Sequence, residues 1–290
     1  MMGSVSDRVL AIDGGGSGCR LALVGANARV EVTAGPANVS SHFSDAIAAI
    51  RSGLGALAAK AEVSEAALHA VPAYLGLAGV VGPKDAVRVA HALPLTSARI
   101  ESDQPATVEG ALGPSDGAVA GLGTGSFFGL RRGAVLRLAG GWGHRIDDRA
   151  SGYWLGREAL RLTLSVADGL EPAGATSIAV TQAFPTPHDI VAFSKDASPD
   201  EVAALAPLVV AAEASGDPAA ARILTAGTEY IVSTLSALGW RRDDPLCTIG
   251  GVAAAFAGRL SQTVDLVDPV GTPLEGAIAR ARRFAKGQLN

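Results

Sequence analysis

Short apolar runs and longer amphipathic segments alternate along the first half of the chain. The apolar runs at residues 9–12 and 19–24 predict two strands. The turn Asp13-Gly14-Gly15-Gly16-Ser17-Gly18 joins them, and glycine fits such a hairpin turn easily because it has no Cβ. A helix with apolar periodicity follows, capped by Ser44 and running to about Lys60. Strands that alternate with helices are typical of an α/β fold in which helices cover a sheet.

The next segments lead to an acidic residue at the end of a strand. Residues 74–77 predict a buried strand that ends at Ala78-Gly79, and residues 83–91 predict a helix with proline at its start. Residues 99–101 predict a short strand that delivers Ser102 and Asp103 to its carboxyl end. Gln104 opens the segment that leads to the second half of the chain.

The pattern of strand, glycine turn and strand then begins again. Residues 117–120 and 127–130 predict two strands around the turn Gly121-Leu122-Gly123-Thr124-Gly125-Ser126. A repeat spacing of about 110 residues fits two domains of like fold rather than a solenoid, whose repeats are about 20–50 residues long. We therefore expect two α/β domains with a ligand cleft between them.

The rest of the chain predicts a helical insertion and a return to the sheet. Residues 151–238 are mainly helical in pattern, residues 246–249 predict a strand, and Gly250-Gly251 opens another helix. The expected domains are residues 1–105 and 106–273, with the helical lobe inserted in the second. A last helix, at about residues 274–290, is a candidate to pack back on the first domain.

Composition narrows the classes of partner. The 290 residues are 48% hydrophobic and 18% charged, with a net charge of −4 and no basic block, so nucleic acid and acidic membrane surfaces are not expected partners. The longest apolar run is too short for a membrane-spanning helix, and the N-terminus lacks the apolar region of a secretory signal. We expect a cytoplasmic protein. Cys19 and Cys247 lack the spacing of a metal site, which favours packing in the core.

The two glycine turns are candidate phosphate sites. Gly14, Gly15, Gly16 and Ser17 expose backbone N–H groups that can form a nest for phosphate oxygens, although a tight hairpin alone would also explain them. Neither a dinucleotide fingerprint nor a Walker loop fits these residues.

The second turn has Gly123, Thr124, Gly125 and Ser126, whose two hydroxyls can donate to phosphate, and the two hairpins could clamp one polyphosphate. Asp13 could hold Mg²⁺ against it, or could simply cap its turn.

Seven motifs in order along nearly the whole chain carry a family resemblance. They are Asp13-Gly-Gly-Gly-Ser17, Gly76-Leu-Ala-Gly79, Ser102-Asp103, Gly121-Leu-Gly-Thr-Gly-Ser126, Gly140-Gly-Trp-Gly-His144 with Asp148, Ser151-Gly-Tyr-Trp-Leu-Gly156 and Gly250-Gly251. The chain resembles the N-acetylglucosamine/glucosamine kinase branch of the BadF/BadG/BcrA/BcrD ATPase family, within the superfamily of sugar kinases, actin and heat-shock chaperones. The resemblance implies two actin-like (ribonuclease H-like) domains with a central cleft, and ATP and Mg²⁺ as cofactors.

The resemblance also assigns roles to residues. It makes Asp13 the magnesium-facing carboxylate and Gly250-Gly251 part of the adenosine site, and it makes Asp103 the base that faces a sugar hydroxyl. If Asp103 only capped the following helix, asparagine would replace it without loss. The sugar-binding residues that the resemblance implies are Asn38, Gly79, Asp103, Trp142, Gly143 and Asp148. Without the family, Trp142 could equally be an ordinary core residue.

One stretch departs from the family pattern. Where a small residue, Asp, an acid or amide, and Gly are expected, the chain has Asp147-Asp148-Arg149-Ala150. The identity of the sugar therefore stays open between glucosamine, N-acetylglucosamine and a related sugar. His144 beside this stretch could touch substrate, but a histidine after a glycine turn is more often structural.

The expected function is therefore ATP-dependent phosphorylation of an amino sugar, with a homodimer implied by analogy with the family. Two alternatives come from other classes. One is an ATPase activator of a dehydratase, which would use an iron–sulfur cluster whose cysteine ligands have no match here. The other is a non-catalytic, sugar-responsive ATP-binding protein or transcription regulator.

Overall fold

The computed structural model describes residues 8–289, which divide into two compact units. The first is Met1–Ser115 together with Val270–Asn290, and the second is Asp116–Pro269. Residues 1–7, on which the expected lack of a secretory signal rested, lie outside the described part. No helix among residues 8–289 is both long and apolar enough to cross a membrane.

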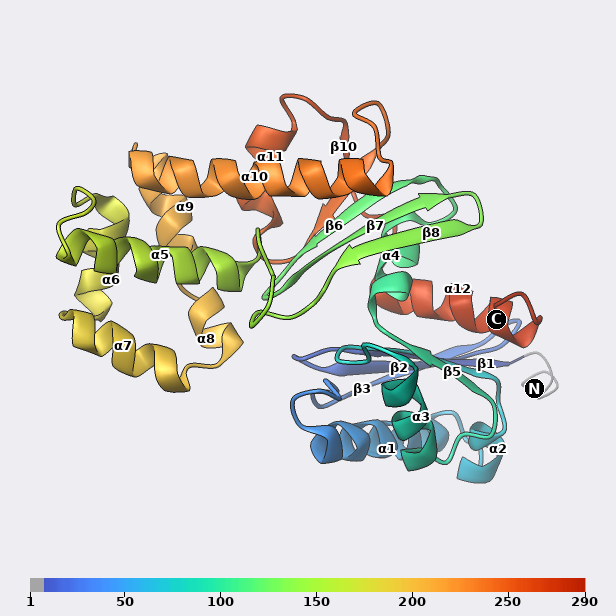
Figure 1. Cartoon of the computed structure of the whole chain (residues 1–290). Helices are drawn as coiled ribbons and strands as arrows, with labels where there is room; N and C mark the ends of the chain where they lie inside the picture. Colours follow the sequence, from blue (N-terminus) through green and yellow to red (C-terminus); the bar gives the residue numbers. More distant parts are fainter. Residues whose placement is uncertain (1–7, 290) are drawn as a thin grey trace. The chain divides into compact units, whose positions relative to one another are not determined.

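The first unit has one five-stranded sheet covered by helices on both faces (Figure 1). Its elements are β1 (Val9–Gly14), β2 (Cys19–Val24), β3 (Arg29–Ala34), α1 (Phe43–Lys60), α2 (Glu65–His69), β4 (Ala73–Leu77), α3 (Pro83–Ala92), β5 (Ala98–Glu101), α4 (Gln104–Leu112) and α12 (Pro273–Ala285). The strand order is β3-β2-β1-β4-β5, with β1, β4 and β5 parallel. The carboxyl ends of these three strands therefore meet at one edge of the sheet.

Strand β1 is buried on both faces, and its side chains alternate between two cores. Leu10 and Ile12 pack in the cluster that includes the buried side of α1, whereas Val9 and Ala11 pack in the cluster with α12. Figure 1 shows α1 and α12 on opposite faces of this sheet. Because both faces are covered, the central strand is an almost continuous apolar run, as the sequence suggested.

The second unit repeats this sheet. Its elements are β6 (Gly117–Leu122), β7 (Ser126–Arg132), β8 (Val135–Gly140), α5 (Gly152–Ala167), α6 (Ala175–Ala183), α7 (Pro187–Asp196), α8 (Pro199–Ala203), α9 (Ala206–Ala214), α10 (Pro218–Leu238), β9 (Leu246–Ile249), α11 (Ala253–Leu260) and β10 (Leu266–Val267). The order is β8-β7-β6-β9-β10, which is the order of the first sheet when the strands are matched in sequence. The shared order confirms the predicted internal repeat.

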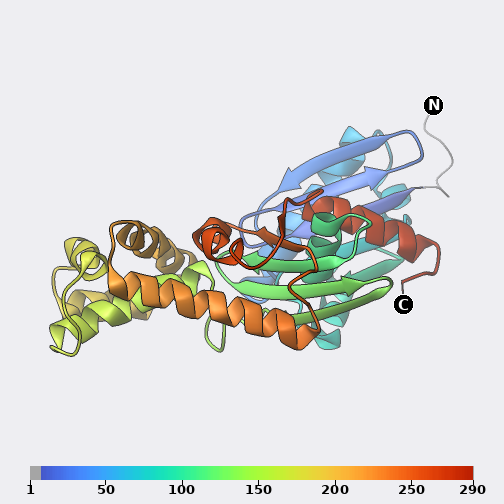
Figure 2. The same ribbon diagram turned by 90° about the horizontal axis from the view of Figure 1, so that it is seen from above.

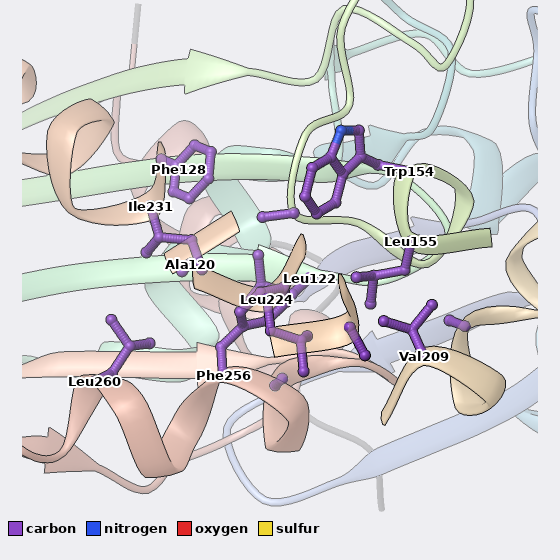
Figure 3. Close-up of a cluster of buried hydrophobic side chains, with 14 of the residues drawn as sticks. Ala120, Leu122, Phe128, Trp154, Leu155, Val209, Leu224, Ile231, Phe256 and Leu260 are labelled. Carbon is purple, nitrogen blue, oxygen red and sulfur yellow. The ribbon is translucent and has the colours of Figure 1, made fainter. Parts of the chain in front are cut away.

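One large core holds the second unit together. Ala120, Leu122 and Phe128 from the sheet pack with α5 and α10 side chains such as Leu155 and Leu224 (Figure 3). Figure 2 shows the long helix α10 running beside the sheet and on to the helices of the lobe. This helix ends at Gly239, whose φ of 96° gives the left-handed C-cap that glycine accommodates without strain.

Two sequence expectations need correction. The division between the units follows Ser115 rather than residue 105, because α4 packs against α12 within the first unit. Helix α1 begins at Phe43 after His42, with no side-chain cap, so Ser44 lies inside the helix rather than at its cap.

Candidate active site

The first glycine turn follows β1 and leaves its tip open. A Cβ on Gly14 would lie 2.6 Å from Leu77 Cδ2 and 3.1 Å from Ala37 Cβ, so a larger residue there would have to displace buried side chains. The Gly15 N–H donates to the Gly18 carbonyl at 2.9 Å, which closes the turn. Gly16 is exposed, and a Cβ on it would meet nothing within 4 Å. Neither crowding nor a positive φ requires glycine at residue 16, whereas a ligand that approaches the backbone closely would.

Asp13 lies at the carboxyl end of β1, just before this turn. Its side chain is 16% exposed, and Arg20 Nη1 lies 3.9 Å from its Oδ2. Burial raises the pKa of Asp13, and the charge of Arg20 offsets part of that rise. A carboxylate at the mouth of a glycine turn supplies the oxygen donor that Mg²⁺ prefers, so Asp13 fits the predicted metal role.

Asp103 lies between β5 and α4, near Asp13. Its backbone carbonyl accepts hydrogen bonds from the N–H of Thr107 at 3.0 Å and from the Thr107 hydroxyl at 2.9 Å, but its carboxylate makes no capping hydrogen bond. Burial, followed by the negative charge of Asp13, raises the pKa of Asp103 to about 6, although the backbone N–H groups of Asp103 and Gln104 offset part of that rise. The parallel order β1-β4-β5 places the two carboxylates at the same sheet edge.

The structure also brings Asn38 and Gly79 together beside the first turn. Ala37 N–H donates to the Gly15 carbonyl at 2.9 Å, and Val39 N–H donates to the Ala78 carbonyl at 3.0 Å. Gly79 has φ of +87°, and a Cβ there would lie 2.5 Å from Asn38 Oδ1. The Asn38 Oδ1 accepts from the N–H and hydroxyl of Ser40, at 3.0 and 2.8 Å.

In the second unit, Gly250 lies against the second glycine turn. Gly123 N–H donates to the Gly125 carbonyl at 3.0 Å, and Val252 N–H donates to the Leu122 carbonyl at 3.0 Å. A Cβ on Gly250 would lie 2.4 Å from the Leu122 oxygen. The predicted phosphate and adenosine segments of this unit are therefore adjacent.

Both hydroxyls of the second turn have acceptors within the protein. Thr124 Oγ1 donates to Asp200 Oδ1 at 2.7 Å, and Ser126 Oγ donates to the Arg149 carbonyl at 2.7 Å. For Thr124 to donate to a phosphate, its hydroxyl must leave Asp200. Asp200, which lies 76 residues away on α8, has no signal in the sequence that would have revealed this contact.

Asp148 lies behind the same turn. The residue is only 8% exposed, and its carboxylate Oδ1 accepts a hydrogen bond from the Ser126 N–H at 3.3 Å. A Cβ on Gly125 would lie 3.0 Å from Asp148 Oδ2, so glycine makes room for the carboxylate. Burial raises the pKa of Asp148 to about 6, while the Ser126 N–H lowers it in part.

A hollow of about 400 Å³ opens beside Asp148, with a lining of mixed charge. It is lined by His144, Ile146, Asp147, Asp148, Arg149, Tyr153, Trp154 and Arg157. The ring of His144 lies 4.8 Å from that of Tyr153, and burial lowers the pKa of His144. The structure thus places His144 at the edge of a cavity as well as in a ring contact.

Trp142 is not a core residue, because it is 62% exposed. It follows two glycines with positive φ and precedes Gly143, whose φ is +89°. On this loop the indole is exposed to solvent, unlike the side chain of a tryptophan packed in a core.

The atypical stretch is structured around Arg149. Its guanidinium pairs with Asp147 at 2.8 Å and lies 4.0 Å above the ring of Tyr230. Ala150 is buried and has φ of +64°, a left-handed conformation that normally favours glycine. The position where the family pattern predicts glycine therefore does use a glycine-like backbone.

The two cysteines pack in separate units. Cys19 and Cys247 are both free and buried, and burial raises the pKa of their thiols to about 12 and about 11. Both are held as neutral thiols, as expected for core residues.

Comparisons with known proteins agree with these features. The model of the BadF/BadG/BcrA/BcrD ATPase family matches residues 10–271. The glucosamine kinase GspK of Vibrio cholerae is 28% identical over 280 residues, which cover 93% of this chain and 94% of GspK.

Two solved structures share the fold. A candidate N-acetylglucosamine kinase from Chromobacterium violaceum has a TM-score of 0.80 and 28% identity, covering 96% of this chain and 100% of that one. A second candidate N-acetylglucosamine kinase, from Porphyromonas gingivalis, has a TM-score of 0.69 and 20% identity, over 96% and 99% of the two chains.

Proposed function

Because the chain belongs to the BadF/BadG/BcrA/BcrD ATPase family, we propose that it is an ATP-dependent kinase of an amino sugar, glucosamine or N-acetylglucosamine. The observation that carries the proposal is the carboxylate of Asp103. It makes no capping hydrogen bond, its pKa is raised to about 6, and it lies at the same sheet edge as Asp13 and the first glycine turn. A carboxylate with that pKa is ionised at neutral pH and is still basic enough to accept a proton.

The chemical step needs Asp103 as the base. As the sugar oxygen forms its bond to the γ-phosphorus, the bond from that phosphorus to the bridging oxygen breaks, ADP leaves, and the hydroxyl proton passes to Asp103. In the first turn, the backbone of Gly16 and Ser17 would receive phosphate oxygens, and in the second unit that of Thr124 and Gly125. The N–H groups of Gly15, Gly123 and Ser126 already donate within the protein, so these residues would shape the turns around the phosphates. Gly250 and Gly251 would lie against the adenosine. Mg²⁺, when bound, would neutralise phosphate charge, and Asp13 is the residue that would hold it.

The sugar would contact a hydrogen-bond donor, a hydrogen-bond acceptor and an aromatic face. Because Asn38 Oδ1 already accepts from Ser40, its amide NH₂ is the part that remains to donate to a sugar hydroxyl. Asp148 would accept from hydroxyls, and the exposed indole of Trp142 offers an apolar face to the C–H surface of a pyranose. Gly79 and Gly143 would let the sugar approach the backbone.

The ATPase-activator alternative is not favoured. A cluster ligand must be a thiolate, whereas the two cysteines are buried and their thiol pKa values are raised. Each is also buried within its own unit.

The test is ATP consumption by the purified protein with glucosamine, N-acetylglucosamine, neutral hexoses or no sugar. We expect ADP release that depends on an amino sugar, with stoichiometric sugar phosphate detected by mass spectrometry. ATP turnover at an equal rate without sugar would instead indicate an ATPase of the activator class.

A further inference from the structure

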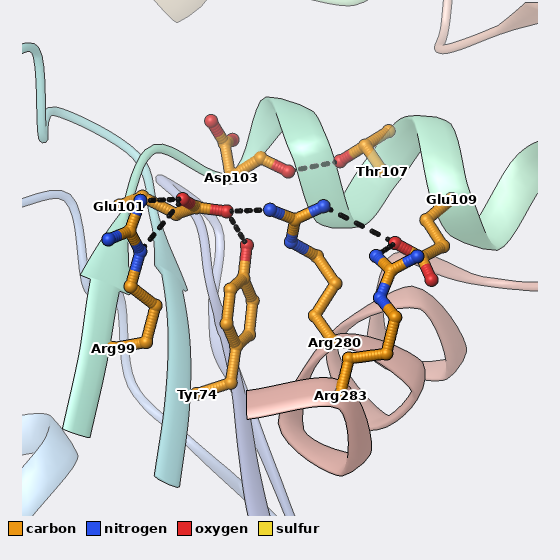
Figure 4. A network of polar contacts seen from close by, with 8 residues as sticks. All are labelled: Tyr74, Arg99, Glu101, Asp103, Thr107, Glu109, Arg280 and Arg283. Atoms are coloured by element: carbon orange, nitrogen blue, oxygen red, sulfur yellow. Dashed lines mark hydrogen bonds and ion pairs between the residues drawn. The ribbon is translucent and has the colours of Figure 1, made fainter. Parts of the chain in front are cut away.

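A buried arginine from the C-terminal helix lies behind the proposed catalytic base. Arg280 on α12 is 7% exposed, and its guanidinium contacts two carboxylates. Nη2 lies 2.5 Å from Glu101 Oε1, and Nη1 lies 3.3 Å from Glu109 Oε2 (Figure 4). Arginine suits this task because its planar fork presents several donors in fixed directions.

The first of these carboxylates is fixed from several sides. Glu101 is the last residue of β5, and its Oε1 also accepts from the hydroxyl of the fully buried Tyr74 at 2.7 Å. Arg99 on the same strand reaches Glu101 Oε2 at 3.2 Å. The end of β5 is therefore tied to β4 and to α12.

The second carboxylate lies on the helix that follows. Glu109 is in α4, and it also pairs with Arg283, one turn after Arg280 on α12. Asp103 lies between these points, two residues after Glu101 and six before Glu109. Arg280 thus joins the strand that precedes Asp103 to the helix that follows it.

Figure 4 shows the Asp103 carboxylate pointing away from these ion pairs. Arg280 therefore does not neutralise the base by contact, and its influence must pass through the backbone of the β5–α4 junction. That backbone is held further by the bond from the Thr107 hydroxyl to the Asp103 carbonyl.

We infer that Arg280 is a positioning residue, which fixes the β5–α4 junction so that the Asp103 carboxylate faces the acceptor hydroxyl in the productive geometry. This inference rests on the proposed function. A displacement of about 1 Å at a catalytic group can cost about 100-fold in rate even when the substituted residue is far from the chemistry. We call the ion pairs of Arg280 with Glu101 and Glu109 the brace, and their loss should lower kcat more than it weakens ATP binding.

The primary test compares Arg280→Met and Arg280→Lys with Arg283→Met. Methionine removes both ion pairs, and lysine keeps the charge but has no fork with which to hold two carboxylates. Arg283→Met is the matched control, because Arg283 lies on the same helix and pairs with Glu109 but not with Glu101. We expect kcat to fall at least tenfold in Arg280→Met and severalfold in Arg280→Lys, with KM for ATP within twofold. Arg283→Met should keep kcat within twofold.

A second measurement separates positioning from general stability. In Asp103→Asn the base is gone, so adding Arg280→Met should slow that variant by less than twofold. Hydrogen exchange of residues 98–107 should also become faster in Arg280→Met than in Arg283→Met. Where Arg280→Met does not fold, Arg280→Lys takes its place in the cycle.

The outcomes distinguish the two proposals. An Arg280→Lys or Arg280→Met enzyme with kcat within twofold of wild type would overturn the brace and leave the kinase intact. So would an equal slowing of the wild-type and Asp103→Asn enzymes by Arg280→Met. A wild-type protein that transfers no phosphoryl group to any amino sugar would overturn the proposed function, and the brace with it.

Discussion

Asp103 is the residue whose surroundings most sharply separate catalysis from structure. Its carboxylate makes no capping hydrogen bond, although it precedes α4. We expect Asp103→Asn to fold and bind both substrates but to lose about 10²–10⁴ in kcat, because an amide cannot accept the hydroxyl proton. Single-turnover kinetics with saturating ATP and sugar measure this directly. A variant within about threefold of wild type would mean that Asp103 is not the base.

The pH dependence of the reaction should report the same group. Since the pKa of Asp103 in the free protein is about 6 and the base must be ionised, we expect kcat/KM for the sugar to fall as pH drops through about 6. The raised pKa acts on stability in the opposite direction: its contribution to folding is full below the ordinary value of 3.8 and is lost as pH rises through about 6. A kcat/KM profile measured with a parallel thermal melt should therefore show activity lost at pH 5 without destabilisation from this residue. A flat profile between pH 5 and 8 would contradict the assignment.

At this scale, sequence motifs find residues whose neighbours are close in the chain. The two glycine turns and Asp103 each stand in a short sequence motif, so the sequence reveals them. Arg280 and Asp200 have none, since each meets its partner only after distant segments have packed. The left-handed backbone of Ala150 was not predicted either, because alanine rarely adopts a positive φ and so gives no sign of one in the sequence.

Of the helices around Asp103, the sequence analysis gave no bounds for α4, whereas it expected the last helix, α12, as a candidate to pack on the first domain. Helix α4 follows Asp103 directly, and α12 comes from the far end of the chain to lie against it (Figure 4). The edge strands β3 and β8 were also not predicted, because all their residues are exposed or half-buried and charged residues interrupt their apolar positions. Central strands such as β1, which are buried on both faces, were predicted well for the opposite reason.

Glycine allows the two helices to approach closely. A Cβ on Gly276 of α12 would lie 1.8 Å from the Ala106 oxygen of α4. We expect Gly276→Ala to destabilise the first unit by about 1–3 kcal/mol, because the helix backbones must separate. Gly258 in α11 is the control, since a Cβ there meets nothing within 4 Å, and Gly258→Ala should stabilise by about 0.5–1 kcal/mol. Urea unfolding of both variants measures their free energies of unfolding. Equal changes in the two variants would show that α4 and α12 do not pack closely at Gly276.

At the scale of the whole molecule, the repeat explains the layout of the candidate residues. Each unit has a hairpin with a glycine turn, followed later by a parallel strand beside the first strand of that hairpin. A glycine with positive φ follows each of these parallel strands, Gly79 after β4 and Gly250 after β9. The same fold thus presents a phosphate-type turn in both units, while the acidic residues Asp13 and Asp103 are features of the first unit alone.

The path of the chain predicts that only the second unit can fold as a single continuous fragment. Residues 116–269 form one continuous unit with its own core, whereas the first unit needs both ends of the chain. Without α12, the apolar side chains of Val9, Ala11 and Tyr74 lose the cover of Leu274 and Ile278. We therefore expect fragment 116–269 to unfold cooperatively on heating, and fragment 1–115 to aggregate or to unfold without a cooperative transition.

Joining the two pieces of the first unit should restore its stability. Val270 N–H donates to the Ala111 carbonyl at 2.8 Å, so Ser115 and Val270 lie near enough for a short glycine–serine linker. A fusion of residues 1–115 to 270–290 should show a cooperative melt by circular dichroism, because α12 again covers its face of the sheet. In the same fusion, Ile278→Asp should abolish that melt, since it places a charge in the buried cluster. If fragment 1–115 alone melted at the temperature of the fusion, the C-terminal helix would not be part of the folding unit that carries Asp103.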